Sequence, residues 1–516
     1  ECIEEAHRVL SSGTLSNHVE KIFTDEWIAN IILNAPKEFD QAFNRFRELY
    51  RTADQQLVNA NEILRYQRRD RAKIEEAERL AKEAQSQIDL LLNQGTTREE
   101  SDFYPYRYLA SEGFLPGYNF PRLPVRAFVA RGEGEYISRP RFLAVSEFGP
   151  HNLIYHEGSR YKVDKLFLPP GGLESRRKRA LLCQVCGYFH DNEEIDCCVS
   201  CSNPLDGSNS ELVPLLEMLN VRARKGDRIT CDDEERIRYG YHITTHYQFS
   251  PEVQLGKIRK QSADVYSSDQ SPLFILTYAP SATLYRINRG WKKSKQPGFL
   301  IDLESGEWKR DQAQNSLQQQ DSNLDVVNPY VWDTSNVLLI SRQNEAIPWN
   351  EEFQASLQYA LQRGMEEVFQ IEESEIASER IGHGEHRSLL FWEASEGGAG
   401  VLRRLVEESN CLAEIARSAL DRLHFDPEKN DLKPTCVQAC YECLLSYSNQ
   451  RDYAILNRHL VVDILAELSN GMTLSRSDSR SYEQHYQYLR SLTDSRSDLE
   501  RHFLDFLYQT KRRLPD

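Results

Sequence analysis

Apolar side chains recur at helical spacing over the first long stretch of the chain with a clear pattern. Between residues 36 and 94 they return every three or four positions, first over 39–64 and then over 74–91. Such a repeat places the apolar residues on one side of an α-helix. Two of these stretches in tandem predict a helical arm or hairpin. Because the second stretch holds only about three heptads, we expect it to pack along a neighbour rather than form an isolated coiled coil.

After a polar linker at 93–102, the pattern changes to short aromatic and β-branched runs broken by Pro and Gly, which predict strands joined by loops. The clearest runs are 118–129, 141–145, 161–163, 241–249, 273–278 and 336–340. The Gln- and Asp-rich stretch 312–328 predicts a mobile insertion. In the last third, the pattern predicts helices at 351–368 and 401–407, a buried strand at 388–392, and mainly helix from 413 onward.

Charge and the chain ends narrow the class of protein. Lys+Arg 63 against Asp+Glu 79 gives a net charge of −16, which argues against a uniformly basic nucleic-acid coat but leaves room for local basic patches. No apolar run approaches the roughly 18–20 residues of a membrane span, and residues 1–5 do not resemble a signal peptide. We therefore expect a cytoplasmic segment of a longer protein, with no membrane partner.

The 11 cysteines are clustered, which is typical of metal sites in a reducing compartment rather than of a secreted disulfide framework. The first cluster predicts a tetrahedral Zn2+ site formed by Cys183, Cys186, Cys198 and Cys201. Cys197 could substitute for its neighbour, but Cys198 restores the two-residue gap. Four thiolates leave no open position for substrate, so the zinc would be structural. The competing interpretation is buried or redox-active cysteines.

The second cluster consists of Cys436, Cys440 and Cys443. Three thiolates can bind one metal, but tetrahedral zinc needs a fourth ligand. The candidates for the fourth ligand are Cys411, His424 and His459. The spacing is also compatible with the iron–sulfur site of radical-SAM enzymes, although no barrel of alternating strands and helices follows, or with uncoordinated core cysteines. Zinc is the favoured interpretation of this cluster too. The first cluster is therefore the expected zinc site, and the second is a possible one.

Two further patterns concern phosphate recognition. A glycine turn at 397–400 lies between a strand and a helix, where backbone amides could receive a phosphate or simply pack closely. Among several basic clusters, one combines cations with an indole that could stack a base. It consists of Arg286, Arg289, Trp291, Lys292 and Lys293. In the competing interpretation Trp291 is a core residue and the arginines bond to loop carbonyls.

The sequence contains no GxxxxGK[ST], GxSxG or HExxH motif, so it predicts no catalytic residue and no ATP hydrolysis by this chain.

Several longer runs resemble the C-terminal portion of large bacterial superfamily 2 DEAD/DEAH-type helicases that carry the MrfA-type zinc-binding (MZB) domain. They are the runs 108–125, 139–144, 155–158, 234–241, 286–291 and 440–450. The resemblance implies that an ATP- and Mg2+-dependent motor precedes this region, and that Cys436, Cys440 and Cys443 bind zinc. A His commonly follows the Asn-Gln of this motif, but Tyr453 stands near that position here. Such helicases occur in DNA repair and in phage defence of the DISARM and Druantia kind.

The stretch 497–507 resembles the opening helix of a PD-(D/E)xK nuclease-like domain, in which Glu500 would belong to a truncated module without chemistry of its own. The competing interpretation of this stretch is a plain amphipathic terminal helix. A third hypothesis for the whole chain is an enzyme, either the nuclease whose terminal domain is cut or an iron–sulfur protein.

Together these observations predict a mixed α+β, multidomain fold with an N-terminal helical arm, a β-rich middle holding a zinc ribbon-like module, and a C-terminal α/β zinc-binding domain. The predicted segments are a helical arm at 1–100, β-rich segments at 101–180 and 206–345, the zinc module at 181–205, the MZB-like domain at 346–470, and a helical tail at 471–516. The predicted function is a zinc-binding accessory region of an ATP-dependent DNA helicase that binds DNA, the motor in cis, or partner subunits of a defence system. The alternative is a protein-interaction scaffold without direct DNA contact.

Overall fold

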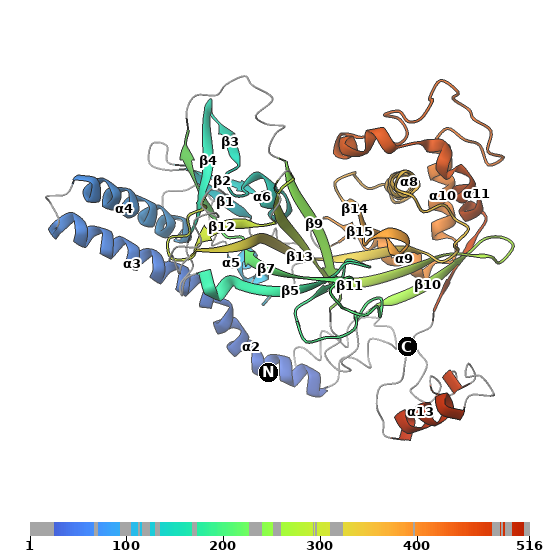
Figure 1. Cartoon of the computed structure of the whole chain (residues 1–516), viewed down its shortest axis with the longest axis horizontal. Coiled ribbons are helices and arrows are strands. Elements are labelled where there is room, and N and C mark those ends of the chain that lie inside the picture. The colour runs from blue at the N-terminus through green and yellow to red at the C-terminus, as the bar shows by residue number, and fades with distance from the viewer. Residues whose placement is uncertain are drawn as a thin grey trace.

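A computed structural model describes most of the chain (Figure 1). The described residues are 25–66, 71–92, 105–111, 114–115, 124–129, 135–167, 173–226, 240–250, 260–292, 294, 297–309, 324–395, 398–476, 486, 489–490 and 498–509. Helices and strands both contribute large parts of the fold, which confirms the predicted mixed α and β class.

The described N-terminal part forms a helical arm, while residues 1–24, 67–70 and 93–100 of the segment predicted as an arm lie outside the described residues. It consists of α2 (Asp25–Ala42), α3 (Asn44–Tyr66) and α4 (Arg71–Leu91). Helices α3 and α4 lie side by side and project from one end of the molecule (Figure 1). Alanines at 53, 60, 77 and 84 are at most 2% exposed, and such small side chains let two helices approach closely. A short helix, α5 (Pro105–Ser111), follows, and Tyr108 donates a 2.8 Å hydrogen bond to the carbonyl of Ala42.

A five-stranded sheet comes next, in the order β2-β1-β8-β4-β3. Its strands are β1 (Val125–Val129), β2 (Glu135–Arg139), β3 (Leu153–His156), β4 (Ser159–Leu166) and β8 (Val221–Lys225). The helix α6 (Arg141–Glu147) contributes Ala144 and Val145 to the core of this part.

The arm is fastened to this sheet by a buried ion network centred on Arg222 of β8. The Arg222 guanidinium forms two hydrogen bonds with the Asp164 carboxylate, at 3.0 and 2.7 Å, and lies 3.5 Å from the Glu83 carboxylate of α4. The side chains of Arg222 and Glu83 are only 5% and 7% exposed. The arm therefore has a specific, charged attachment to the sheet.

An 11-stranded sheet forms the centre of the molecule along the path β16-β10-β11-β13-β7-β5-β6, with β9, β12, β14 and β15 joined to it. The strands are β5 (Arg177–Cys183), which follows the short 3-10 helix η2 (Leu173–Arg176), β6 (Phe189–His190), β7 (Ser210–Glu217), β9 (Tyr241–Gln248), β10 (Gln261–Tyr266), β11 (Pro272–Trp291), β12 (Phe299–Asp302), β13 (Leu324–Arg342), β14 (Ile376–Ile381), β15 (Ser388–Glu393) and β16 (Met472–Ser475). Strand β15 pairs with β13, so the sheet crosses the predicted boundary at residue 345.

Two of these strands are much longer than the sequence pattern predicts. Strand β11 continues through Pro280, where its register against β13 shifts between Ala279 and Ala282 and Ser281 takes a φ of 54°. The Asn336 side chain accepts a 3.2 Å hydrogen bond from the Ser281 amide and so satisfies the bulge. Strand β13 begins at Leu324, so residues 324–328 of the predicted mobile insertion are strand instead, while 310–323 lie outside the described residues.

The central sheet is buried on both faces. Helices α8 (Glu351–Phe369), α9 (Val401–Glu407), α10 (Cys411–Arg422) and α11 (Val462–Ser469) cover one face, near the end of the molecule opposite the arm (Figure 1). The first cysteine cluster contributes to the core on the other face. Strand β15 shows the alternation directly, because Leu389 and Phe391 belong to the helical core and Leu390 and Trp392 to the cysteine-side core.

The predicted helical tail at 471–516 needs a correction. It starts with strand β16, whose Met472 to Ser475 pair with β10, and only later contains a helix, α13 (Asp498–Gln509). A strand was missed because four residues are too short for a periodic signal. The Glu500 side chain lies outside the described residues. No helix among the described residues has the length and apolarity needed to cross a membrane.

Arg222→Ala should lower the free energy of unfolding by about 3 kcal/mol, because it removes the only arginine paired with the half-buried Asp164 carboxylate among the described residues and leaves the buried Glu83 carboxylate with Arg79 alone, 4.0 Å away. Arg224→Ala, on the same strand but exposed, is the matched control and should change stability by less than about 0.5 kcal/mol. Urea unfolding of both variants measures the difference. Equal stability of the two variants would show that the ion network does not fasten the arm.

Candidate metal centres

The first cysteine cluster closes at the end of β5. Its four Sγ atoms lie within 4.8 Å of one another, with Cys183 and Cys201 3.7 Å apart and Cys186 and Cys198 3.6 Å apart. Zn–S bonds of about 2.3 Å in a tetrahedron require S···S distances of about 3.8 Å. The four predicted cysteines are therefore brought together at the spacing that zinc requires.

Local backbone turns create this geometry. Each pair of cysteines is followed by a residue in the left-handed region, Gly187 with a φ of 79° and Ser202 with a φ of 58°. The Gly187 amide donates to the Cys183 carbonyl at 2.9 Å and the Ser202 amide to the Cys198 carbonyl at 2.8 Å, so the two loops have the same hydrogen-bonded turn. Cys197, the alternative ligand, is exposed and lies outside the group.

The surroundings of this cluster favour thiolate formation at some sulfurs. Hydrogen bonds with Cys186 and Cys198 lower the pKa of the Cys183 thiol to about 7. The Asn203 side-chain amide lies 3.4 Å from the sulfur of Cys201, whose pKa is also lowered, chiefly by hydrogen bonds from the other three thiols. The same contacts raise the pKa of the Cys186 and Cys198 thiols, so without a metal the four thiols share negative charge unequally.

The second cluster has a histidine as its fourth member. His424, Cys436, Cys440 and Cys443 offer ligand atoms that all lie within 4.8 Å of one another. His424 Nε2 is 3.3 Å from Cys440 Sγ, and Cys436 Sγ is 3.9 Å from Cys443 Sγ. Burial acts to raise the pKa of Cys440, but hydrogen bonds with His424 and Cys443 bring it down to about 6. One imidazole and three thiolates form a ligand set that zinc accepts.

The other candidates for the fourth ligand are occupied elsewhere. Cys411 is buried at the start of α10, where burial raises the pKa of its thiol to about 11. His459 Nε2 lies 3.1 Å from the Val437 carbonyl and its ring packs edge-on against Phe425. Tyr453 donates a 2.7 Å hydrogen bond to the Ser446 carbonyl. Of the three candidates for the fourth ligand, only His424 belongs to the cluster.

A buried arginine holds the two segments of the second cluster together. Arg458, at the start of the 3-10 helix η6 (Arg458–Val461), is fully buried, with its guanidinium 4.6 Å from the Phe425 ring centroid. It donates to the carbonyls of Leu423 and Cys436 at 2.9 and 2.7 Å. Leu423 directly precedes His424, and Cys436 is itself a member of the cluster. By holding these two carbonyls, Arg458 positions ligands without touching a metal.

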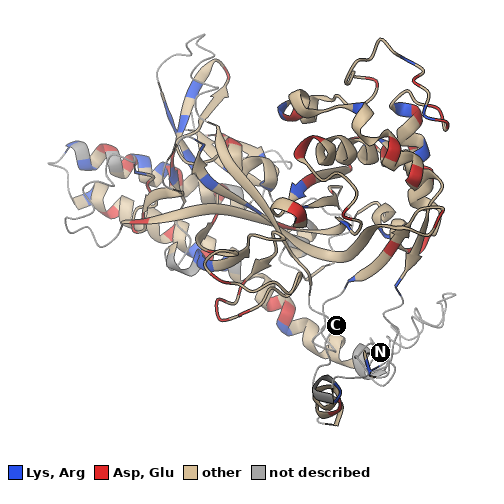
Figure 2. Ribbon diagram, turned by 45° about the vertical axis from the view of Figure 1, so that its right-hand side comes forward, with Lys and Arg blue, Asp and Glu red and all other residues tan. Residues whose placement is uncertain are grey.

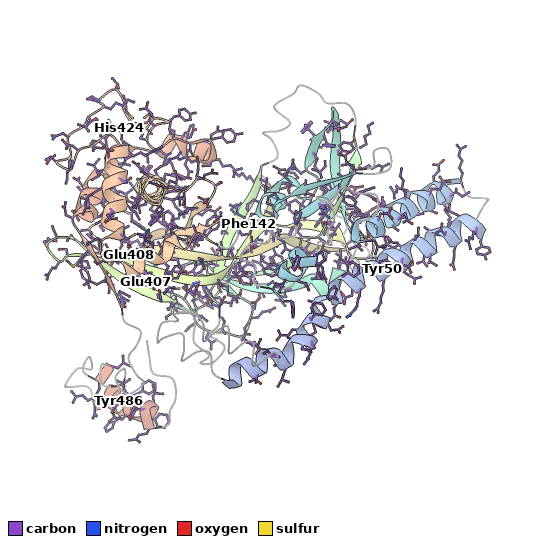
Figure 3. All side chains as sticks on the ribbon, turned by 180° about the vertical axis from the view of Figure 1, so that it is seen from behind. Tyr50, Phe142, Glu407, Glu408, His424 and Tyr486 are labelled. Atoms are coloured by element: carbon purple, nitrogen blue, oxygen red, sulfur yellow. The ribbon has the colours of Figure 1, made fainter. Side chains whose placement is uncertain are left out.

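His424 owes its orientation to the end of helix α10. It takes a left-handed φ of 65° directly after the last turn, and its carbonyl accepts a hydrogen bond from the Leu432 amide at 2.8 Å. A non-glycine residue rarely adopts this conformation without a reason. The cluster lies at the end of the molecule opposite Tyr50 of the arm (Figure 3).

A third group that could hold a metal was not found from the sequence. Glu135, His156 and Glu157 lie at the start of β2 and in the β3–β4 hairpin, partly exposed. Glu135 lies 21 residues before the adjacent His156 and Glu157, so the sequence gave no spacing signal, and exposed acidic groups are common without an ion.

The basic segment predicted to contact nucleic acid is held largely by protein partners. Arg286 forms a 2.5 Å ion pair with Glu379 and lies over the Phe142 ring, and Arg289 forms an ion pair with Glu211. Trp291 stacks on Tyr241 with ring centroids 4.4 Å apart. These contacts favour a structural role for Arg286 and Trp291, with carboxylates as the main arginine partners.

Lys292, the next basic residue of that segment, is exposed. Lys292 ends the strand region and its amide donates to the Gly240 carbonyl at 2.9 Å, while Lys293 lies outside the described residues. Figure 2 shows acidic and basic residues interspersed along the arm and the sheet. DNA contact through this segment therefore stays a prediction.

The glycine turn before α9 already has an internal anion. The Glu393 carboxylate, on a residue 2% exposed, accepts hydrogen bonds from the Leu402 amide at 3.1 Å and from the Asn336 side chain at 2.9 Å. A side chain at Gly398, which has a φ of 72°, would collide with this carboxylate. The structure thus favours close packing over phosphate binding here. Gly397 lies outside the described residues.

Comparison with known proteins bears on the second cluster. Residues 357–444 match the family model described as MZB, the MrfA Zn-binding domain. The chain therefore contains an MZB domain, as the resemblance implies, and its second cluster lies within the matched residues. Among solved structures, the chain is similar to one titled "Crystal Structure of DUF1998 helicase MrfA bound to DNA", with 11% identity and a TM-score of 0.34. That similarity covers 68% of this chain and 34% of the other, so this chain corresponds to about a third of that protein's length. A search of the curated proteins returned no match.

Cys183→Ser should remove about one equivalent of zinc and lower the melting temperature, since the free energy of binding a structural metal is also folding free energy. Metal analysis together with calorimetry measures both effects. Cys197→Ser, at the exposed neighbour outside the cluster, is the control and should retain the metal. Full zinc content and unchanged melting in Cys183→Ser would refute the first site.

His424→Ala should likewise lose one equivalent of zinc, because three thiolates alone leave the tetrahedron incomplete. His459→Ala is the matched control, and His424→Cys should keep the metal by supplying a fourth thiolate. The zinc content of the three variants decides the identity of the ligand. If His459→Ala lost zinc and His424→Ala kept it, the fourth ligand would be His459 and the assignment of His424 would be wrong.

Proposed function

We propose that this chain is a non-catalytic, zinc-binding accessory region of a DNA helicase of the MrfA kind, which binds DNA next to a motor located elsewhere in the same protein. The observation that carries the proposal is the MZB match at 357–444, inside which one histidine and three cysteines form a complete ligand set. Zinc bound there by His424, Cys436, Cys440 and Cys443 would cross-link the loop after α10 to the cysteine segment.

The architecture supports a structural role for both metal centres. Each cluster supplies four protein ligands, so neither leaves a position for a substrate. The sequence carries no phosphate-binding loop of the Walker type, and ATP and Mg2+ would therefore belong to the motor. The resemblance in sequence adds the finer proposal that the parent protein acts in DNA repair or phage defence, in the cytoplasm and together with other subunits.

A second candidate function is a protein-interaction scaffold without DNA contact. The observation that favours it is a group of exposed apolar and aromatic side chains around the second cluster. Tyr447, Val437, Tyr441 and Leu432 are 86, 75, 68 and 61% exposed. Large apolar residues that stay exposed mark candidate interaction surfaces, and each of these four stands within four residues of a ligand of the second cluster in the sequence. A partner subunit could use this surface whether or not DNA binds elsewhere.

The zinc-loaded chain should bind single-stranded DNA with an affinity that falls steeply as salt rises, because each neutralised phosphate releases a counterion. Fluorescence anisotropy between about 50 and 200 mM salt measures the slope, which should be about −0.7 per phosphate contact on single strands. If the chain held zinc in both centres but did not bind DNA at low salt, the proposal would be contradicted. The protein-interaction scaffold would then be the remaining candidate function.

A further inference from the structure

The group of Glu135, His156 and Glu157 lies where the two edges of the five-stranded sheet meet. Strands β2 and β3 are the outermost strands of that sheet, and among the described strands they are not paired with each other. Nevertheless Oε1 of Glu135, the first residue of β2, lies 3.1 Å from Nε2 of His156, the last residue of β3. The sheet therefore curls until its edges touch at this contact.

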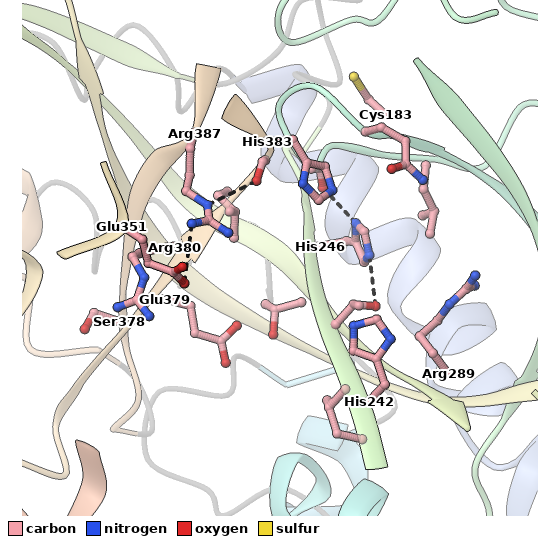
Figure 4. A pocket seen from close by; sticks show the side chains of 18 of the residues that line it. Cys183, His242, His246, Arg289, Glu351, Ser378, Glu379, Arg380, His383 and Arg387 are labelled. Carbon is pink, nitrogen blue, oxygen red and sulfur yellow. Dashed lines mark hydrogen bonds and ion pairs between the residues drawn. The ribbon is translucent and has the colours of Figure 1, made fainter. Parts of the chain in front are cut away.

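The His156 nitrogen at this contact is enclosed by protein but forms no hydrogen bond. Nε2 is a buried atom without a hydrogen-bond partner among the described residues, although the Glu135 oxygen is 3.1 Å away. That oxygen therefore does not lie along the N–H direction of the ring. His246, which lines a polar cleft between the first cysteine turn and β14, is the contrasting case (Figure 4). Each of its ring nitrogens lies 3.1 Å from an oxygen and is hydrogen-bonded to it.

The distance between the two atoms fits two ligands of one metal ion. With bonds of about 2.0–2.2 Å to zinc, a nitrogen and an oxygen ligand lie about 3.4 Å apart in a tetrahedron and about 3.0 Å apart at a right angle. The observed 3.1 Å lies between these values. A nitrogen and an oxygen that approach so closely without bonding to each other are arranged as ligands that share a third partner.

The third group of the site comes from the turn between β3 and β4. Glu157 directly follows His156, and its ligand atom lies within 4.8 Å of the other two. Neighbouring residues of a regular strand point to opposite faces of the sheet. Glu157 instead has a φ of 42° and Gly158 a φ of 71°, as in a two-residue hairpin turn. The turn thus brings an imidazole and a carboxylate to the same point.

The charges at this point favour a divalent cation over a proton. Two carboxylates whose oxygens lie within 4.8 Å of each other repel. A protonated His156 would offset one of these charges, whereas a divalent cation offsets both. Exposed carboxylates alone would not indicate an ion, but an enclosed imidazole nitrogen between them is a ligand that zinc accepts.

We propose that Glu135, His156 and Glu157 bind a divalent transition-metal cation such as Zn2+, which joins β2 to the β3–β4 hairpin and so closes the five-stranded sheet. The site shares no ligand with either cysteine cluster, and the inference does not depend on the proposed DNA-binding function. Three protein ligands leave a coordination position for water. The ion is therefore held less tightly than in the cysteine clusters, and the stability of this sheet follows the concentration of free metal.

The test titrates Zn2+ into the full chain after both cysteine clusters are loaded. The parent chain should bind a third equivalent with micromolar affinity, and its melting temperature should rise, because the metal binds only the folded sheet. His156→Ala should lose the third equivalent, and Glu157→Gln should weaken its binding about tenfold, since an amide oxygen carries no charge. His386→Ala, at an exposed histidine outside the group, is the control and should bind as the parent chain does.

Cobalt separates this site from metal exchange at the cysteines. Co2+ held by nitrogen and oxygen lacks the intense thiolate charge-transfer absorption that Co2+ held by cysteine shows, so a third equivalent of Co2+ should add none. A third equivalent that both His156→Ala and Glu157→Gln retained would overturn the proposal, as would a parent chain that bound only two. If His156→Ala melted earlier while the parent bound no third equivalent, His156 and Glu135 would be an ion pair only.

Discussion

The molecule depends on one sheet that is buried on both faces. Strands β11, β13 and β15 send alternate side chains into the helical core around the second cysteine cluster and into the core around the first. A change in the register of β15 by one residue would exchange its side chains between the two cores. The two metal centres are therefore not independent modules joined by a linker, because a single strand register serves both.

Direct contacts reinforce this coupling. The Val185 carbonyl, between the first two cysteines, accepts a 3.1 Å hydrogen bond from the His383 amide after β14. Gly382 has a φ of 82° and lies so close to that carbonyl that a side chain would overlap with it. The first cysteine turn thus rests directly on the MZB domain, and the cleft beside it is lined by both.

The parts that the sequence predicts well are those with local signals. Helical periodicity located α8 and α9 to within a residue, and CxxC spacing selected Cys198 over Cys197. What could not be predicted depends on contacts distant in sequence. His424 was one of three candidates because only the fold shows which of them meets the cysteines. The full length of β11 was missed because Pro280 is a strand breaker unless a bulge accommodates it. The partners of Arg286 and Arg289 come from β14 and β7, which no local pattern indicates.

The arrangement of the chain also has a consequence for the order in which the molecule assembles. Each cysteine cluster closes within a short stretch, 183–201 or 424–443, so the loop entropy lost in forming it is small. The sheet between them instead joins strands from β5 to β16, almost three hundred residues apart in sequence. Contacts of such separation form slowly. We therefore expect the cysteine turns to form early in folding, and the shared sheet, whose pairings are distant in sequence, to close more slowly.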